Sequence, residues 1–233
     1  MIFALPCAGG RAENFKRWNN YIDFKFVSLE YPGHWERWNE LLNDDYMAIA
    51  DDVESQILEY TKNHMVNDIY IVGHSMGALL TCIVAQKESL SKLIKGIVLI
   101  AMAAPNKAKD LRFKDLTNEI EIKSFLREIR QVPEKLLVSD FFVDNLLPSI
   151  KNDFRLFNNM IQDITVFDKI RVPCLVMYSE DDPIIKKDEI TVWSDYAENT
   201  TYEIIGGNHF FPYSQKYIPM ICEIINKYIN SNY

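Results

Sequence analysis

The chain has 233 residues, of which 48% are hydrophobic and 25% are charged, a length and composition suited to one globular domain with a substantial core. The formal net charge of -8 argues against non-specific nucleic-acid binding, which needs a positive surface. No apolar run reaches the roughly 18 residues of a membrane helix, and no basic segment precedes the first apolar residues, so we expect no membrane association, no signal peptide and a cytoplasmic location.

Predicted strands and helices alternate along the chain. Short apolar runs predict strands at residues 2–5, 24–29, 69–72, 97–101, 174–178 and 201–205. Apolar residues at helical spacing predict helices at residues 44–63 and 76–86, within 186–196, and at 215–229. Strands that alternate with helices form a mainly parallel sheet with helices on both faces. The expected fold class is therefore α/β, as a single domain over residues 1–233.

The segment of residues 105–168 breaks this alternation. Its apolar residues fall in several short amphipathic stretches and include Phe125, Leu126, Ile129, Phe141, Phe142, Leu146, Leu147, Phe154, Phe157 and Met160. We interpret the segment as a helical insertion between two strands of the sheet. Such insertions often cover an active site as a lid. The alternative is a helical addition without a role of its own.

A G-x-S-x-G pattern at residues 73–77 lies between a predicted strand and a predicted buried helix. This is the setting of the nucleophile elbow of α/β-hydrolases, in which a tight turn exposes the serine hydroxyl at the edge of the sheet. The turn leaves no room for side chains two residues before and two residues after the serine. The pattern therefore indicates Ser75 as the nucleophile of an α/β-hydrolase fold, and the alternative is a Gly-Ser turn without chemistry.

A serine hydroxyl is a weak nucleophile until a base accepts its proton. Of the four histidines, His209 follows the last predicted strand, where the chain order Ser, acid, His of α/β-hydrolases places the base. We expect His74 to be structural and His64 to face solvent. The acid that orients the base is expected after the penultimate strand, where Asp182 is the first choice and Asp181 the alternative.

Acyl transfer also needs two backbone N–H groups directed at the negative charge that develops on the carbonyl oxygen. Met76, which follows the expected nucleophile, supplies one. We expect the second from the loop after the first strand, from Ala8 or, as the second choice, from Cys7. Because no histidine is adjacent to Cys7 in the sequence, we expect this thiol to pack rather than to react.

The four cysteines are Cys7, Cys82, Cys174 and Cys222. They form no CxxC pair and have no partnering histidines, which argues against a zinc site and against a disulfide framework. We therefore expect free thiols, mostly in the core, and no metal ion.

Several motifs together resemble one known family. Residues 5–10 (L-P-C-A-G-G) are similar to an opening F-P-x-A-G-G, residues 31–37 to a P-G-R-x-x-R loop, and residues 206–211 (G-G-N-H-F-F) to a closing G-G-H-F-F with one residue inserted. Residues 132–134 and 147–154 are similar to landmarks of a lid region. With the G-x-S-x-G motif, this set resembles the type II thioesterases of non-ribosomal peptide and polyketide synthesis over nearly the whole chain.

The resemblance implies an α/β-hydrolase fold and an enzyme that hydrolyses acyl thioesters on the phosphopantetheine arms of acyl or peptidyl carrier protein domains. Such an enzyme clears aberrant or stalled acyl groups from an assembly line. It would use a triad of Ser75, His209 and Asp182 through an acyl-enzyme, need no cofactor and act as a monomer. The alternatives are a carboxylesterase or lipase, an acyltransferase, and a non-catalytic protein that binds carriers.

The sequence departs from the family pattern at two places near the expected site. Ser179 stands where the family usually has glycine before the acid loop, and His34 replaces the usual arginine. Carrier domains are typically acidic, so an acidic partner needs a local basic surface. The candidates in the insertion are Lys107, Lys109, Arg112, Lys114, Lys123, Arg127 and Arg130. Acidic residues are interleaved with them, and an ordinary mixed surface is the alternative.

Overall fold

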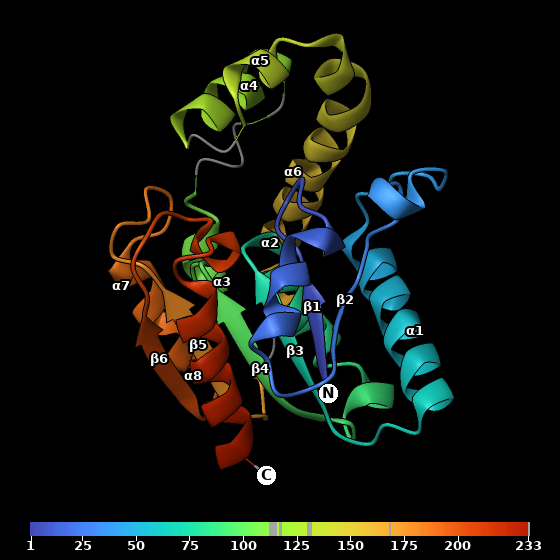
Figure 1. The fold of residues 1–233 in the computed structure, drawn as a ribbon, viewed down its shortest axis with the longest axis vertical. Coiled ribbons are helices and arrows are strands. Elements are labelled where there is room, and N and C mark those ends of the chain that lie inside the picture. Colours follow the sequence, from blue (N-terminus) through green and yellow to red (C-terminus); the bar gives the residue numbers. More distant parts are fainter. Residues whose placement is uncertain (112–115, 117, 130–131, 168, 233) are drawn as a thin grey trace.

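The computed structural model describes residues 1–111, 116, 118–129, 132–167 and 169–232. In this part of the chain, the strands form one 6-stranded sheet in the order β2-β1-β3-β4-β5-β6, and every neighbouring pair is parallel (Figure 1). The strands are β1 (Ile2–Leu5), β2 (Phe26–Ser28), β3 (Ile69–His74), β4 (Ile94–Ile100), β5 (Cys174–Tyr178) and β6 (Thr200–Ile204). The expected α/β class with a parallel sheet is confirmed.

Helices of three kinds connect the strands. The α-helices are α1 (Tyr46–His64), α2 (Met76–Val84), α3 (Pro105–Ala108), α4 (Glu119–Glu128), α5 (Glu134–Leu137), α6 (Leu147–Gln162), α7 (Lys187–Ile190) and α8 (Ile218–Ser231). The 3-10 helices are η1 (Ala12–Asn20), η2 (Trp35–Arg37), η3 (Glu88–Leu90), η6 (Ile164–Val166), η7 (Thr191–Asp195) and η8 (Phe211–Tyr213), and a π-helix, η5, covers Phe142–Leu146. Among the described helices, none combines the length and the apolarity that crossing a bilayer requires.

Different helices cover the two faces of the sheet (Figure 1). Successive side chains of a strand point to opposite faces. Ile71 of β3 therefore packs in one core with α1, α2 and α6, whereas the next residue, Val72, packs in a second core with η1 and α8. Burial on both faces explains why the central strands are continuous apolar runs in the sequence.

The helix α1 shows how local sequence sets the ends of an element. The side chain of Asp45 accepts hydrogen bonds from the backbone N–H groups of Met47 (2.9 Å) and Ala48 (3.2 Å), which satisfies donors at the start of the helix. Met65 ends the helix in the left-handed conformation (φ 53°). His64, the last helical residue, is exposed, as the sequence predicts.

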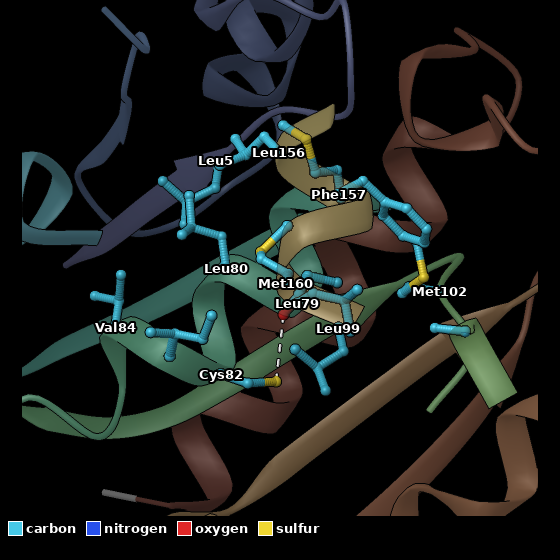
Figure 2. Close-up of a cluster of buried hydrophobic side chains, with 14 of the residues drawn as sticks. Leu5, Leu79, Leu80, Cys82, Val84, Leu99, Met102, Leu156, Phe157 and Met160 are labelled. Atoms are coloured by element: carbon cyan, nitrogen blue, oxygen red, sulfur yellow. Dashed lines mark hydrogen bonds between the residues drawn. The ribbon is translucent and has the colours of Figure 1, made fainter. Parts of the chain in front are cut away.

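Within the described chain, α3, α4, α5, η5 and α6 lie between β4 and β5, in the segment predicted to be an insertion. The sequence predicts short amphipathic stretches, but α6 is one helix of 16 residues, and the π-helical turn η5 leads directly into it. One end of α6 packs beside α2, whereas α4 and α5 lie at its far end, away from the sheet (Figure 1). Figure 2 shows Leu156, Phe157 and Met160 of α6 in one buried cluster with Leu79 and Leu80 of α2.

Two differences from the predicted elements have simple causes. The strand β4 begins three residues earlier than predicted because exposed Lys95 and then Gly96 interrupt its apolar run. The 3-10 helix η1 is absent from the prediction because only Phe15 and Trp18 of its nine residues are buried, too few to give a periodic pattern. This helix covers the second core of the sheet.

Candidate active site

Ser75 lies in a tight turn between the end of β3 and the start of α2. Its backbone has φ 55° and ψ -122°, a strained conformation for a residue with a side chain. A Cβ on Gly73 would lie 2.3 Å from the carbonyl oxygen of Gly77, and a Cβ on Gly77 would lie 2.5 Å from that of Leu5. Backbone atoms cannot move aside, so the sequence needs glycine at both positions to form this turn.

His209 joins the serine to one carboxylate. Its Nε2 lies 2.9 Å from Ser75 Oγ, and its Nδ1 lies 2.8 Å from Asp182 Oδ2. An ionised carboxylate only accepts hydrogen bonds, so Nδ1 carries the proton and Nε2 is free to accept the proton of the serine hydroxyl. The backbone N–H of Ile184 donates to the other oxygen of Asp182 at 2.8 Å, which holds the carboxylate toward the ring.

The structure brings Asp182, and not Asp181, to the histidine. The side chain of Asp182 is 1% exposed in its pairing with His209, whereas Asp181 is an exposed residue. The three side chains come from the turn after β3, the loop after β5 and the loop after β6. Because these strands are parallel, all three turns meet at the carboxyl edge of the sheet.

Ser75, Met76, Ala8 and His209 line a cavity of about 280 Å³. Within the described chain, no backbone hydrogen bond involves the N–H of Ala8 or the N–H of Met76, so both groups are available to a ligand. The wall opposite the serine is apolar and comes from the insertion. It includes Phe125, Leu136, Phe142, Ile150, Phe154 and Phe157. This arrangement can hold an apolar group beside an activated serine, with two N–H donors on the same cavity.

A family model described as the thioesterase domain matches residues 1–229. The chain belongs to the thioesterase domain family. The prediction of a thioesterase from the opening and closing motifs is thereby confirmed, and with it an enzyme that acts on thioesters.

Several relatives and solved structures are also similar to this chain. The thioesterase is 24% identical over 212 residues to the AMB antimetabolite synthetase AmbE of Pseudomonas aeruginosa, covering 89% of this chain but only 10% of AmbE. It is 24% identical over 226 residues to the probable anguibactin biosynthesis thioesterase AngT of Vibrio anguillarum, covering 93% of this chain and 87% of AngT. The solved structure of YbtT, a type II thioesterase from the yersiniabactin NRPS/PKS biosynthetic pathway, has the same fold: its TM-score is 0.82 at 19% identity, with 100% of this chain and 94% of YbtT covered.

His74 of the thioesterase is fully buried and supports the loop that carries His209. Its Nε2 lies 2.9 Å from the carbonyl oxygen of His209, and its Nδ1 lies 2.9 Å from the hydroxyl of Tyr213. A carbonyl oxygen only accepts, so Nε2 carries the proton. Burial lowers the pKa of His74 well below its usual value, which leaves the ring neutral and Nδ1 as an acceptor for the Tyr213 hydroxyl. The expected structural role of His74 agrees with these contacts.

Cys7 lies in the oxyanion loop, which we define as residues 6–10, but burial raises the pKa of its thiol to about 12. At neutral pH it stays protonated and is a poor nucleophile. All four cysteines are free and buried, as the sequence predicts. Among the described residues, no group of three or more histidine, cysteine or acidic side chains is placed to hold a metal ion.

Ser179 and His34, which depart from the family pattern, make contacts that the sequence does not reveal. The hydroxyl of Ser179 donates to the carbonyl oxygen of Gly207 and also accepts from the N–H of Asp181, so it ties the acid loop to the base loop. His34 is 2% exposed and is paired with Asp153 of α6. Their departure from the family pattern was the only signal in the sequence, and it did not reveal their partners.

The candidate basic surface of the insertion is partly neutralised. Lys123 pairs with Glu119 at 2.6 Å, and Arg127 pairs with Glu134 at 2.7 Å. Three further candidates lie outside the described residues: Arg112, Lys114 and Arg130. The two pairs favour the mixed surface over a basic patch on α4.

Proposed function

We propose that this thioesterase hydrolyses acyl thioesters on the phosphopantetheine arms of carrier proteins in non-ribosomal peptide or polyketide synthesis, and that it removes aberrant or stalled acyl groups. One observation carries the chemistry: His209 bridges Ser75 Oγ and Asp182 at the wall of an apolar cavity. The biosynthetic roles named for AngT and YbtT support this setting. In this proposal the protein needs no cofactor and works as a cytoplasmic monomer.

The proposed reaction has two steps. Ser75 Oγ attacks the thioester carbonyl carbon while His209 Nε2 takes its proton, and the N–H groups of Met76 and Ala8 donate to the oxyanion. The carbon–sulfur bond then breaks, and the departing thiolate receives the proton from His209. In the second step His209 takes a proton from water, which attacks the carbonyl carbon of the acyl-enzyme. The bond between that carbon and Ser75 Oγ then breaks, His209 returns the proton to Ser75 Oγ, and the acid leaves.

The cavity supports an apolar acyl group as the preferred substrate. The charged side chain that lines the cavity, among the described residues, is that of Arg11, which follows the oxyanion loop and is exposed. The aromatic and aliphatic wall of the insertion offers no charged partner to an acyl tail, and burying an unpaired charge against this wall would be costly. In this proposal the insertion of residues 105–168 acts as a lid that forms the acyl-binding wall. Octanoyl thioesters are then better substrates than malonyl thioesters.

Replacing Ser75 tests the proposal. We expect Ser75→Ala to lower kcat for octanoyl carrier protein by roughly 10⁴-fold or more, because the acyl-enzyme cannot form. The matched control is Ser55→Ala, which removes an exposed hydroxyl of α1. Retained hydrolysis in Ser75→Ala would contradict the mechanism. An oxygen ester cleaved much faster than the thioester of the same acyl group would instead favour a carboxylesterase, and mass spectrometry of the product would reveal transfer to an amine or alcohol.

A further inference from the structure

A buried carboxylate of the lid helix α6 holds the oxyanion loop. Asp153 is fully buried, and its Oδ2 accepts a hydrogen bond from the N–H of Gly9 at 2.7 Å. The same oxygen lies 3.1 Å from His34 Nε2, whereas Oδ1 has no hydrogen-bond partner in the described structure. Leaving one oxygen of a buried carboxylate unpaired costs stability. This cost calls for a role beyond packing.

Three successive peptide units of the oxyanion loop are each tethered. The carbonyl oxygen of Pro6 accepts from the Tyr31 hydroxyl at 3.0 Å. The carbonyl oxygen of Cys7 accepts from the N–H of Gly10 at 2.8 Å. The N–H of Gly9 is held by Asp153, which is the tether that comes from the lid. The N–H of Ala8 belongs to the middle unit, so its direction is set by the bond from Gly10 to the Cys7 carbonyl oxygen together with the tethers on either side.

The lid helix also touches the oxyanion loop through an apolar contact. Gly9 has φ +66°, and a Cβ at this position would lie 2.7 Å from Ile150 Cγ1 on α6. Ile150 and Asp153 are three residues apart and therefore lie on the same face of the helix. The oxyanion loop thus meets α6 at Gly9, through the hydrogen bond to Asp153 and the close approach of Ile150.

The geometry around His34 indicates a charged ring. Its Nδ1 lies 2.9 Å from the carbonyl oxygen of Pro32, and its Nε2 faces the Asp153 carboxylate. Both partners accept hydrogen bonds, so both nitrogens carry protons. Burial alone lowers the pKa of His34, but the charge and the hydrogen bond of Asp153 outweigh it and raise the pKa to about 9. His34 is therefore an imidazolium at neutral pH.

We propose that Asp153 is a positioning residue for catalysis: paired with His34, it directs the Ala8 N–H at the oxyanion and so couples the lid helix to the transition state. The inference rests on the proposed function of the site. Asp153 does not line the cavity, so its effect falls on kcat rather than on binding of the acyl group. Two substitutions, Asp153→Ala and His34→Gln, change the pair in different ways and distinguish an effect on kcat from an effect on binding of the acyl group.

The pair predicts a pH dependence of kcat. Below the pKa of His34 the imidazolium neutralises Asp153. As the pH rises through about 9 the ring loses this positive charge and keeps a single N–H, so it can no longer donate to both the Asp153 carboxylate and the carbonyl oxygen of Pro32. Among the described residues, the other ionisable groups facing His34 are Glu30, whose pKa burial raises to about 7, and Tyr31, whose pKa burial raises well above its usual value. His34→Gln keeps a donor for Asp153 but cannot titrate. It separates the contribution of His34 from those of Glu30 and Tyr31.

The first test compares two buried polar residues that are neighbours on α6. We expect Asp153→Ala to lower kcat for octanoyl carrier protein by about 10²-fold with little change in KM, as the loss of an oxyanion donor does. Asn152→Ala is the matched control, because Asn152 donates to the carbonyl oxygen of Asn43 and not to the oxyanion loop. An octyl boronic acid, which forms a tetrahedral anion on the serine, should lose affinity in proportion to kcat.

The results of these substitutions decide whether Asp153 positions the oxyanion loop. Unchanged kcat in Asp153→Ala would overturn the inference, and so would an equal loss in Asn152→Ala, which would indicate general destabilisation. If Asp153→Ala does not fold, wild type and His34→Gln decide: we expect an alkaline fall of kcat near pH 9 only in wild type, and the same fall in both would contradict the role of the pair. If Ser75→Ala abolishes turnover while Asp153→Ala is fully active, only this inference fails and the proposed function stands.

Discussion

The sheet edge and the proposed lid hold their parts of the site in different ways. At the sheet edge, backbone bonds fix the turn of the candidate nucleophile and the end of the neighbouring strand: the N–H of Ser75 donates to the carbonyl oxygen of Ile100 at 2.8 Å, and the N–H of Ala101, just after β4, donates to that of Met177 at 2.9 Å. The lid helix α6 reaches the rest of the molecule through side chains. Asn152, for example, donates to the carbonyl oxygen of Asn43 at 2.8 Å.

This difference bears on two properties of the thioesterase: the rate of its reaction and its choice of acyl group. Backbone bonds do not depend on side-chain identity, so the sheet edge can place the same chemistry in many sequences. The lid wall consists of side chains, and each substitution there changes the shape of the cavity. We therefore expect changes at the sheet edge to affect rate and folding, and changes in the lid to affect the choice of acyl group.

The largest expected effect is at the acid of the sheet edge. Asp182→Asn should lower kcat by about 10⁴-fold, because an amide N–H facing His209 Nδ1 favours the wrong tautomer of the base. The measurement is single-turnover hydrolysis of octanoyl carrier protein. The neighbouring Asp181→Asn is the control and should behave as wild type, since Asp181 is exposed. The opposite ranking of the two variants would make Asp181 the acid.

The second prediction concerns the backbone of the same edge. Gly77→Ala should lower the free energy of unfolding by about 3 kcal/mol, because the new Cβ meets backbone oxygens that cannot move. Urea denaturation measures this change. In the control, Gly206→Ala, the new Cβ would lie 3.2 Å from the ring of Tyr217, a side chain that can shift. Equal stability of the two variants would show that the turn is less rigid than its backbone contacts indicate.

The smallest expected effect tests the lid. Leu136→Ala removes a half-buried side chain from the cavity wall, so kcat/KM for octanoyl carrier protein should fall by about tenfold while that for acetyl carrier protein changes little. Val138→Ala, at an exposed position of the same turn, is the control. An equal loss for both acyl groups would show that this wall does not contact the acyl tail. It would contradict the expectation that changes in the lid affect the choice of acyl group.

The sequence by itself determined the sheet and the order of the candidate site residues. Parallel strands buried on both faces need continuous apolar runs, and a tight turn after a strand needs glycines around the serine, so both leave local patterns. The positions of Ser75, Asp182 and His209 after three strands followed from those patterns. The choice between Asp182 and Asp181 did not, because two adjacent acids in one loop look alike in sequence.

Only the tertiary structure decided the contacts that join distant segments. It placed Asp182 rather than Asp181 beside His209 and joined Asp153 of α6 to Gly9 and His34. A buried ion pair between residues that are 119 positions apart leaves no periodic trace, since neither partner can be recognised without the other. Local propensity and apolar spacing thus determined the six strands and the long helices that cover them, though not η1 or the full length of α6. Contacts between side chains of separate elements decided how the site is held.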